Sequence, residues 1–356
     1  MEENGTLSRH GQLKHRFRNR IEKELFDCMP TDIQDYLLEA DPAEMKEGYL
    51  STMVKLPWKS QSKLPPIELG LAKALLDHTH YAMVDVKEKV LRYMACQKHL
   101  GKNYGTVLLL SGPPGVGKTT IAASIAKAMG RPCVKISLAG VADALFLRGA
   151  QTIFHNAKPG KIVEALTRCG SFCPLILLDE IDKMGNSVEH GDPESVLLDI
   201  LDTDRSKFVD NYLGFPLDLS NVIFIATANS TRRLSKILLD RMEVIELPAY
   251  TAYDKAKIAG RYVWPRLVRE YRLDCLDNLC DPMGERFEHP ESLRLEDDAI
   301  QVLINVCQED GVRDLERLCR RICESVISVY YADGELIQSV HAENLERLLG
   351  PVYYKN

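Results

Sequence analysis

A glycine-rich segment at residues 112–119 has the residue types needed to hold a chain of phosphates. It reads Gly-Pro-Pro-Gly-Val-Gly-Lys-Thr and fits the pattern G-x-x-x-x-G-K-[ST]. Glycines let backbone N–H groups surround phosphate oxygens, Lys118 would neutralise charge on the β- and γ-phosphates, and the Thr119 hydroxyl would ligate Mg²⁺. At average residue usage, chance produces such a match in about one chain in a hundred. The predicted ATP contacts are Gly112, Pro113, Pro114, Gly115, Val116, Gly117, Lys118, Thr119 and Thr120.

Two adjacent carboxylates, Asp179 and Glu180, follow the apolar run Leu175–Leu178. Successive side chains at a strand end point to opposite sides, so Asp179 can meet Mg²⁺ while Glu180 reaches toward the γ-phosphate. A kinase has no need of this second acid, because its nucleophile is a substrate hydroxyl. Glu180 therefore favours hydrolysis of the nucleotide.

Three further polar residues complete the predicted catalytic set. Asn229 follows the apolar run Val222–Ala226 and could orient the attacking water. Arg241 stands just before the last apolar run, and Arg313 opens a helix after Gly311. One guanidinium from the same chain and one from a neighbouring chain would stabilise charge on the transferring phosphoryl group.

The elements that must position these residues are short strands alternating with helices. β-prone runs separated by amphipathic helices predict an α/β fold with a parallel sheet covered on both faces. After Pro248 the strands disappear and helical patterns follow. We expect a helical N-terminal segment at 1–60, an α/β nucleotide-binding domain at 61–248 and an all-helical lid at 249–356. The predicted strands are Val107–Leu110, Val134–Ile136, Leu175–Leu178, Val222–Ala226 and Val244–Leu247, and the predicted helices are Leu13–Phe26, Thr119–Met129, Tyr253–Tyr271, Asp297–Cys307 and Val312–Tyr330.

Composition excludes several classes of protein. The 356 residues carry 45 Lys+Arg and 51 Asp+Glu, a net charge of −6, so no global positive field favours nucleic acid or an anionic membrane. A hydrophobic share of 45% with 27% charged residues is typical of globular chains. No apolar run approaches the roughly 18 residues that a membrane span needs. Because residues 1–19 are polar, without the apolar stretch of a secretory signal, we expect a cytoplasmic location.

The ten cysteines do not predict a metal site or a disulfide framework. No C-x-x-C pair occurs, and neither Cys169/Cys173 nor Cys275/Cys280 has a histidine at zinc-ligand spacing. Cys319 and Cys323 fall on one apolar helical face with Leu315, Leu318, Ile322 and Val326. They are predicted to be thiols of a helical core.

With these motifs in place, the sequence resembles the AAA+ ATPase module of the Lon proteases over about residues 50–352. The segments that carry the resemblance are Ser111–Thr120, Arg148–Gly149, Lys158–Ile162, Leu177–Gly185, Gly191–Pro193, Val222–Asn229, Leu238–Thr251 and Gly311–Arg317, with Leu56–Trp58, His80–Tyr81 and Val86–Glu88 upstream. The fold that the resemblance implies is a P-loop NTPase of the AAA+ type.

The resemblance also implies roles and partners. It makes Asp179 and Glu180 the Walker B pair, Asn229 sensor 1, Arg241 the finger offered to a neighbouring subunit and Arg313 sensor 2, and it places Tyr81 near the adenine. It implies a ring of identical chains, usually a hexamer, that hydrolyses ATP with Mg²⁺ at subunit interfaces and pulls unfolded or damaged protein through a central pore.

Two segments depart from the family pattern. Where Lon proteases carry an aromatic-aliphatic pair before P-G-K, this chain has Phe154 followed by His155. Phe154 keeps the aromatic that would grip a polypeptide, whereas His155 would weaken the grip or make it sensitive to pH. The segment Arg232–Lys236 replaces a proline-containing turn, which would change how Arg241 is presented.

The sequence leaves several functions open. Lon proteases continue into a Ser–Lys peptidase domain, and the chain stops at about the point where that domain would begin, so peptidase activity is not expected from this chain alone. The main expectation is an ATP-driven unfoldase. The alternatives are a truncated or split Lon protease, working with a separate peptidase, and a nucleotide-dependent assembly scaffold. Translocation of nucleic acid is a fourth, less favoured reading, based on Arg148, Lys158 and Lys161.

Overall fold

The computed structural model describes residues 21–350 apart from 41–44, 46, 61–63, 104, 186–190, 203 and 277–291. The first part of the predicted helix Leu13–Phe26, the polar stretch 1–19 and Cys280 lie outside the described residues. The chain forms two compact units that interleave along the sequence. Unit 1 comprises residues 1–72, 89–110 and 122–245, and unit 2 comprises 73–88, 111–121 and 246–356. The three-domain division expected from the sequence stays a prediction.

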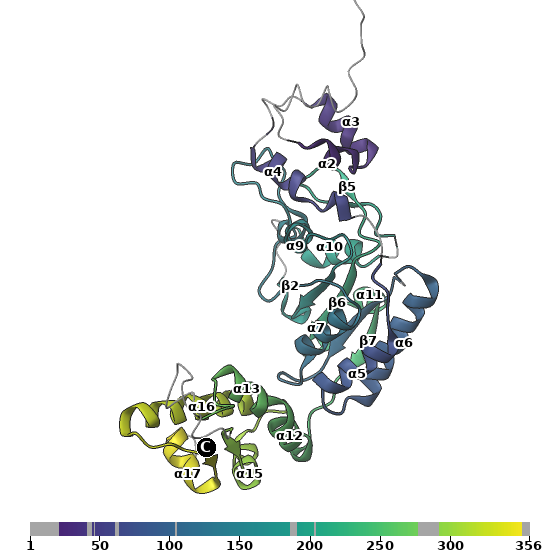
Figure 1. The fold of residues 1–356 in the computed structure, drawn as a ribbon. Helices are drawn as coiled ribbons and strands as arrows, with labels where there is room; N and C mark the ends of the chain where they lie inside the picture. Colours follow the sequence, from purple (N-terminus) through teal and green to yellow (C-terminus); the bar gives the residue numbers. More distant parts are fainter. Residues whose placement is uncertain are drawn as a thin grey trace, which may run out of the picture. The chain divides into compact units, whose positions relative to one another are not determined.

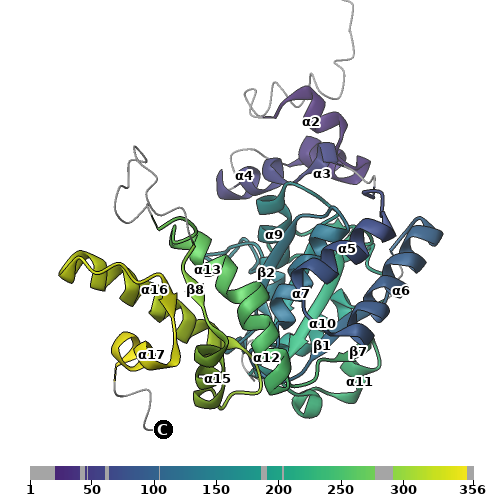
Figure 2. The same ribbon diagram turned by 60° about the horizontal axis from the view of Figure 1, so that its bottom comes forward.

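A parallel sheet in the order β2-β3-β6-β1-β7 forms the centre of unit 1 (Figures 1 and 2). Its strands are β1 (Val107–Ser111), β2 (Cys133–Ser137), β3 (Leu175–Asp179), β6 (Ile223–Ala228) and β7 (Met242–Glu246). In register, Cys133 pairs with Leu175 and Leu175 with Ile223. Every residue of β1, β3 and β6 is buried, as expected for aliphatic strands covered on both faces. The predicted α/β fold with a parallel sheet is confirmed.

Helices on both sides of the sheet and a group at the N-terminal end complete unit 1. In both views α2–α4 form a group at the α9 end of the unit (Figures 1 and 2). Trp58 joins this group to the core: its ring lies 5.5 Å from that of Phe172, and its indole N–H donates to Met53 O at 2.8 Å. The helices wholly in unit 1 are α2 (Lys23–Asp27), α3 (Thr31–Glu39), α4 (Glu47–Lys55), α8 (Leu145–Arg148), α9 (Lys161–Cys169), α10 (Pro193–Ile200) and α11 (Lys236–Leu239). Three more helices, α5 (Leu69–Thr79), α6 (Val84–Leu100) and α7 (Lys118–Ala128), have residues in each unit. A small antiparallel pair joins β4 (Phe208–Val209) to β5 (Pro216–Leu217).

Most of unit 2 is the helical segment predicted after Pro248. Its helices are α12 (Ala252–Ile258), α13 (Trp264–Glu270), α15 (Asp297–Val306), α16 (Arg313–Asp333) and α17 (Ala342–Leu349). A π-helical turn at Ala259–Val263 interrupts the predicted helix Tyr253–Tyr271, just before Pro265, which has no N–H to continue an α-helical ladder. The expectation of an all-helical lid was incomplete, because β8 (Arg294–Leu295) and β9 (Ser339–Val340) form a short parallel pair.

The cysteine and membrane expectations can be compared with the described residues. Cys319 and Cys323 are fully buried in the α16 face predicted for them. Cys133, in contrast, is exposed. Among the described residues, no group of three or more His, Cys, Asp or Glu side chains has a metal-binding arrangement. In the same part of the chain, no helix has both the length and the apolar character needed to cross a bilayer.

Candidate active site

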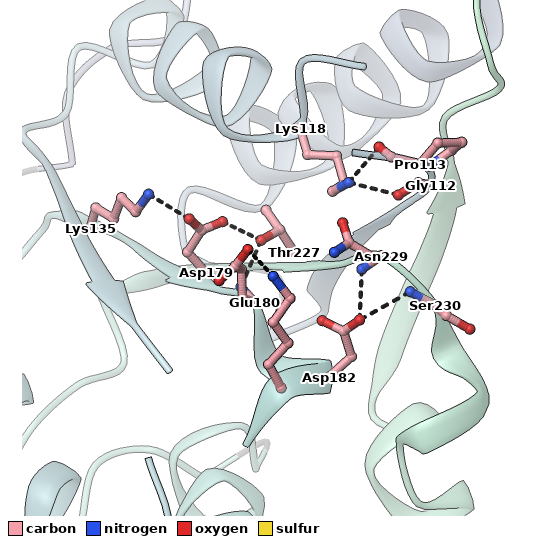
Figure 3. A network of polar contacts seen from close by, with 11 residues as sticks. Gly112, Pro113, Lys118, Lys135, Asp179, Glu180, Asp182, Thr227, Asn229 and Ser230 are labelled. Carbon is pink, nitrogen blue, oxygen red and sulfur yellow. Dashed lines mark hydrogen bonds and ion pairs between the residues drawn. The ribbon is translucent and has the colours of Figure 1, made fainter. Parts of the chain in front are cut away.

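The glycine-rich loop lies in unit 2, between the end of β1 and the start of α7. The ammonium group of Lys118 donates to the carbonyl oxygens of Gly112 at 2.6 Å and Pro113 at 2.7 Å (Figure 3). Lys118 is also the first residue of α7, so the N–H groups of the helix N-terminus follow the loop directly. Such N–H groups and the helix dipole favour an anion at this point.

The helical segment of unit 2 touches the loop backbone directly. Val312 N–H donates to Gly115 O at 3.1 Å, and the Tyr250 hydroxyl donates to Val116 O at 3.0 Å. A Cβ on Gly311 would lie 2.4 Å from Pro114 O, so only glycine fits there. Through these contacts Arg313, the next residue after Val312, begins α16 beside Gly115. The predicted sensor 2 arginine and the phosphate loop therefore lie together.

His80 packs against the other side of the loop and was not among the predicted site residues. Its Nε2 lies 3.1 Å from Thr120 Oγ1 and its Nδ1 lies 2.9 Å from Thr79 Oγ1. Burial, aided by the nearby ammonium of Lys87, lowers the pKa of His80 to about 4, so the imidazole is neutral at pH 7. Lys87 is itself held by His80 O at 2.7 Å and Asp77 Oδ1 at 2.9 Å.

Tyr81, predicted to lie near the adenine, follows His80 in a strained connection between α5 and α6. Its ring makes an edge contact with Tyr262, with centroids 6.4 Å apart. The next two residues, Ala82 and Met83, have φ of 51° and 54°, a region that non-glycine residues rarely adopt. Backbone strain of this kind clusters at ligand sites and is held by the surrounding packing, which here includes the buried Met83.

Asp179 ends β3 in unit 1 with both carboxylate oxygens engaged. Oδ1 accepts a hydrogen bond from the Thr227 hydroxyl on β6, and Oδ2 lies 2.5 Å from the ammonium of Lys135 on β2 (Figure 3). Thr227 is fully buried, and its oxygen also accepts the backbone N–H of Glu180 at 3.0 Å. One hydroxyl thus positions both members of the predicted acidic pair.

Glu180 adopts φ 59° and ψ 47°, the left-handed conformation. The side chain leaves the strand direction at this residue and makes a 2.5 Å ion pair with Lys183. The sequence predicted that the side chains of Asp179 and Glu180 would point to opposite sides. It did not predict the left-handed conformation that turns the Glu180 side chain away from the strand direction.

Asn229, the predicted sensor 1, is fixed by its backbone. Its N–H and that of Ser230 donate to Asp182 Oδ2, at 3.0 and 3.2 Å (Figure 3). Asp182 is buried, and its other oxygen, Oδ1, has no partner among the described residues. The acidic segment after β3 therefore holds the end of β6 in place.

Arg241 lies at the other end of the strands. It precedes β7, whereas Asp179 ends β3 and Glu180 follows that strand, so in a parallel sheet Arg241 is at the amino ends of the strands and the acidic pair at the carboxyl ends. Its guanidinium contacts Leu198 O at 3.3 Å and Asp202 Oδ2 at 3.5 Å. It lines a cavity of about 330 Å³ together with Gly105, Thr106, Leu201, Asp202, Asp240, Met242 and Glu243.

The predicted substrate residues Phe154 and His155 lie on an exposed loop of unit 1. Phe154 is 57% exposed and its neighbour Ile153 is 79% exposed, although large apolar side chains are usually buried. This exposure excludes a core position for Phe154.

Comparisons with known proteins show which domain the chain contains and which proteins it resembles. Residues 108–249 match the model of the ATPase family associated with various cellular activities (AAA). The chain is 41% identical over 313 residues to a Lon protease of Acinetobacter baumannii, covering 87% of this chain and 36% of that protein. It is also 41% identical over 302 residues to the mitochondrial Lon protease homologue of Saccharomyces cerevisiae, covering 84% of this chain and 25% of that protein. The chain contains an AAA ATPase domain and resembles the AAA region of the Lon proteases.

The matches cover most of this chain but only part of each relative. The chain spans about a quarter to two fifths of the length of the curated relatives it matches. A structure described as the Thermotoga maritima RuvB P216G mutant is similar in fold, with a TM-score of 0.51 and 18% identity, covering 81% of this chain and 73% of that one. This similarity supports the AAA-type P-loop fold.

The residues of the glycine-rich loop suit a nucleotide, because a lysine and a helix N-terminus favour phosphate. Each considered by itself, the Thr119 hydroxyl and the Asp179 carboxylate are hard oxygen groups of the kind that Mg²⁺ prefers. Sequence reasoning did not identify His80, Thr227, Lys135 or Asp182 as part of the site. Thr227 could have been found from its position two residues before Asn229. The roles of the other three residues depend on contacts between distant parts of the sequence.

Proposed function

We propose that this chain binds ATP with Mg²⁺, hydrolyses it, and uses the energy to unfold and translocate protein substrates. The observation that carries the proposal is the single buried hydroxyl of Thr227, which holds Asp179 and the backbone of Glu180 together. A merely structural acidic turn would not need its second carboxylate on a strained residue directly after a buried strand.

In the proposed reaction the loop residues and the acidic pair act on one nucleotide. Lys118 leaves the carbonyls of Gly112 and Pro113 and pairs with the β- and γ-phosphates, while Tyr81 packs against the adenine. Thr119 and Asp179 would hold Mg²⁺, which neutralises charge on the phosphate oxygens. Glu180 accepts a hydrogen bond from a water and directs it at the γ-phosphorus, and Asn229 orients the same water.

Arg241 completes this chemistry from a neighbouring copy. Its place at the amino end of β7 keeps it from the acidic pair of its own chain, so it is useful only across a subunit interface. Arg313, beside Gly115, would contribute the second guanidinium in the same chain. We therefore propose a ring of identical chains, of which a hexamer is the expected form.

Unfolded protein is the proposed substrate, gripped by the loop that presents Phe154. An exposed aromatic on a tethered loop gives sequence-independent apolar contact, and His155 adds a hydrogen-bonding group. Peptide-bond cleavage is not assigned to this chain; the alternative is that its motor serves a Lon-type peptidase on another segment or chain. The relatives include proteins named as mitochondrial and peroxisomal, so the cytoplasmic location remains a prediction.

The decisive experiment replaces Glu180 with Gln. We expect ATP turnover to fall by roughly 100-fold or more while nucleotide affinity stays within a few-fold of wild type. Glu346→Gln, an exposed position on α17, is the matched control. Equal turnover in Glu180→Gln and wild type would refute the hydrolytic assignment. Absence of any stimulation of turnover by unfolded casein would instead favour the nucleotide-dependent scaffold.

A further inference from the structure

The loop that presents Phe154 is closed at its base by backbone contacts within unit 1. Ala150 N–H donates to Lys158 O at 3.0 Å, which brings the two ends of residues 150–158 together. A Cβ on Gly149 would lie 2.7 Å from Gly160 N, so the two glycines pack backbone against backbone. The exposed residues 153–156 lie between these ends.

A buried carboxylate from a distant segment holds one end of the loop. Asp210 has no exposed surface, and its Oδ2 accepts Gly160 N–H at 2.8 Å. Its Oδ1 accepts the N–H groups of Tyr212 at 2.9 Å and Leu213 at 3.2 Å. Gly160 is also the residue that precedes α9, so the negative charge lies at the N-terminus of that helix, where the dipole favours it.

The next residue, Asn211, holds the other end. Its N–H donates to Arg148 O at 2.7 Å, and its side-chain amide donates to Gly149 O at 3.1 Å. Two consecutive residues thus fix both ends of the loop. The same turn is attached to the N-terminal helices, because the Tyr49 hydroxyl donates to Leu213 O at 2.7 Å.

We infer that Asp210 is a positioning residue for the substrate loop and fixes the direction in which Phe154 meets a polypeptide. The inference rests on the proposed function, because it assigns Phe154 to substrate contact. Asp210 itself touches no substrate. It acts by fixing Gly160, from which the loop extends, so that force on Phe154 is transmitted to α9 instead of being lost in loop motion.

The test compares Asp210→Asn with Asp218→Asn. Asparagine has nearly the same size as Asp210, but its NH₂ group is a donor and cannot accept. It must face either the Gly160 N–H or the N–H groups of Tyr212 and Leu213, so the hydrogen bonds on that side are lost. Asp218 lies eight residues further along the same segment, is exposed, and accepts Ser220 N–H at 2.8 Å. ATP turnover is measured with and without unfolded casein, and thermal unfolding confirms that each variant is folded.

For Asp210→Asn we expect basal turnover within about twofold of wild type and an increase of about fivefold or more in the casein concentration that gives half-maximal stimulation. Asp218→Asn should match wild type in both. In a Phe154→Ala background, adding Asp210→Asn should cause no further change, because both act through the same loop. Equal loss of basal and stimulated turnover in Asp210→Asn, or full additivity with Phe154→Ala, would overturn the inference.

Hydrogen–deuterium exchange separates this inference from the proposed function. Faster exchange of the amides of residues 150–160 in Asp210→Asn, with the rest of the sheet unchanged, supports the positioning role whether or not casein stimulates turnover. Unchanged exchange in this segment refutes it, also when the motor proposal holds. If casein does not stimulate turnover of the wild-type chain, the proposed grip on substrate is refuted, but the positioning role of Asp210 is not. Asn211→Ala, which removes the Gly149 contact, gives a second variant with the same expected exchange pattern.

Discussion

The hydroxyl of Thr227 donates a hydrogen bond to the carboxylate of Asp179, joining the ends of β6 and β3. The same oxygen accepts the N–H of Glu180. Thr227→Val keeps the shape and removes both bonds, so the Asp179 carboxylate and the partly buried N–H of Glu180 each lose the hydroxyl that holds them. We expect a loss of roughly 1–3 kcal/mol in the free energy of unfolding and of roughly 10-fold or more in ATP turnover.

The control for this change is Thr227→Ser, which restores the hydroxyl and should recover most of the turnover. Nucleotide affinity is measured alongside, since the phosphate loop is untouched and should bind ATP with near wild-type affinity. A Thr227→Val chain with normal turnover would show that the acidic pair is held by other contacts.

His80 makes stability depend on pH. Because the pKa of His80 in the folded chain is lowered to about 4 while that of the unfolded chain is near 6.5, the unfolded state binds more protons between these values. Folding stability therefore falls as pH drops from about 6.5 to 4, by up to roughly 3 kcal/mol from this residue. In thermal unfolding against pH, His80→Asn should have a shallower slope than wild type over this range. The exposed His155→Asn is the control, and equal slopes for His80→Asn and wild type would contradict the assignment.

Arg241 should act across a subunit interface. Arg241→Ala and Glu180→Gln chains are each expected to be nearly inactive. Mixed in equal amounts, they form interfaces of which about a quarter combine an intact Glu180 with an intact Arg241 from the neighbour. Turnover should therefore reappear on mixing. Mixing that restores nothing, although light scattering shows mixed assemblies, would mean that Arg241 serves its own chain or none.

Acid should weaken the hydrogen bonds by which Asp210 holds the loop at residues 150–158. Burial, together with the nearby charge of Glu164, raises the pKa of Asp210 to about 6 against three N–H donors that lower it. The groups around it are Glu164, which is paired with Lys161, and the phenols of Tyr49 and Tyr212. Since the folded state binds the extra proton between about pH 4 and 6, acid favours the neutral carboxyl, which accepts N–H bonds poorly.

We therefore expect stimulation by casein to decline as pH falls through about 6 in wild type, while basal turnover declines less. Asp210→Asn cannot titrate, so its low stimulation should not change over this range. A wild-type ratio of stimulated to basal turnover that stays constant from pH 7.5 to 5.5 would contradict this prediction.

Gly311 should tolerate no side chain. In Gly311→Ala the Cβ would lie 2.4 Å from Pro114 O and 2.4 Å from the carbonyl carbon of Gly115. Neither backbone atom can rotate away, so we expect a large loss of nucleotide affinity, measured by fluorescent-nucleotide titration, and a lower midpoint of thermal unfolding. Gly260→Ala is the matched control, because its Cβ meets Ile300 at an ordinary 3.7 Å.

The sheet could be predicted from the sequence because each strand contains a short aliphatic run. Each predicted strand is present. The first three are extended by one or two residues, as Leu175–Leu178 becomes Leu175–Asp179, and the last two are shifted, to Ile223–Ala228 and Met242–Glu246. The phosphate loop and the acidic pair could also be predicted, since the residues of each motif are neighbours in the sequence. The π-turn before Pro265 and the pairing of β8 with β9 were not, because they arise from backbone hydrogen bonds that no local pattern encodes.

The positioning residues could not be found in the same way. Asp210 is separated by 50 residues from the Gly160 amide that it holds, and His80 by 40 from Thr120. The sequence predictions do not include Asp210, and they name His80 only together with Tyr81, as part of the resemblance. Their roles arise from burial, which removes water as a competing partner and makes each hydrogen bond specific.

The contact between Gly311 and the phosphate loop has a mechanical meaning. Two backbones in van der Waals contact, joined by the Val312–Gly115 hydrogen bond, leave no flexible side chain between them to absorb a displacement. In the proposed reaction, a shift of the loop by a fraction of an ångström on phosphate release would therefore pass directly to the start of α16, a helix of 21 residues. Such a helix would act as a lever arm, converting a small chemical step at its base into a larger excursion at its far end.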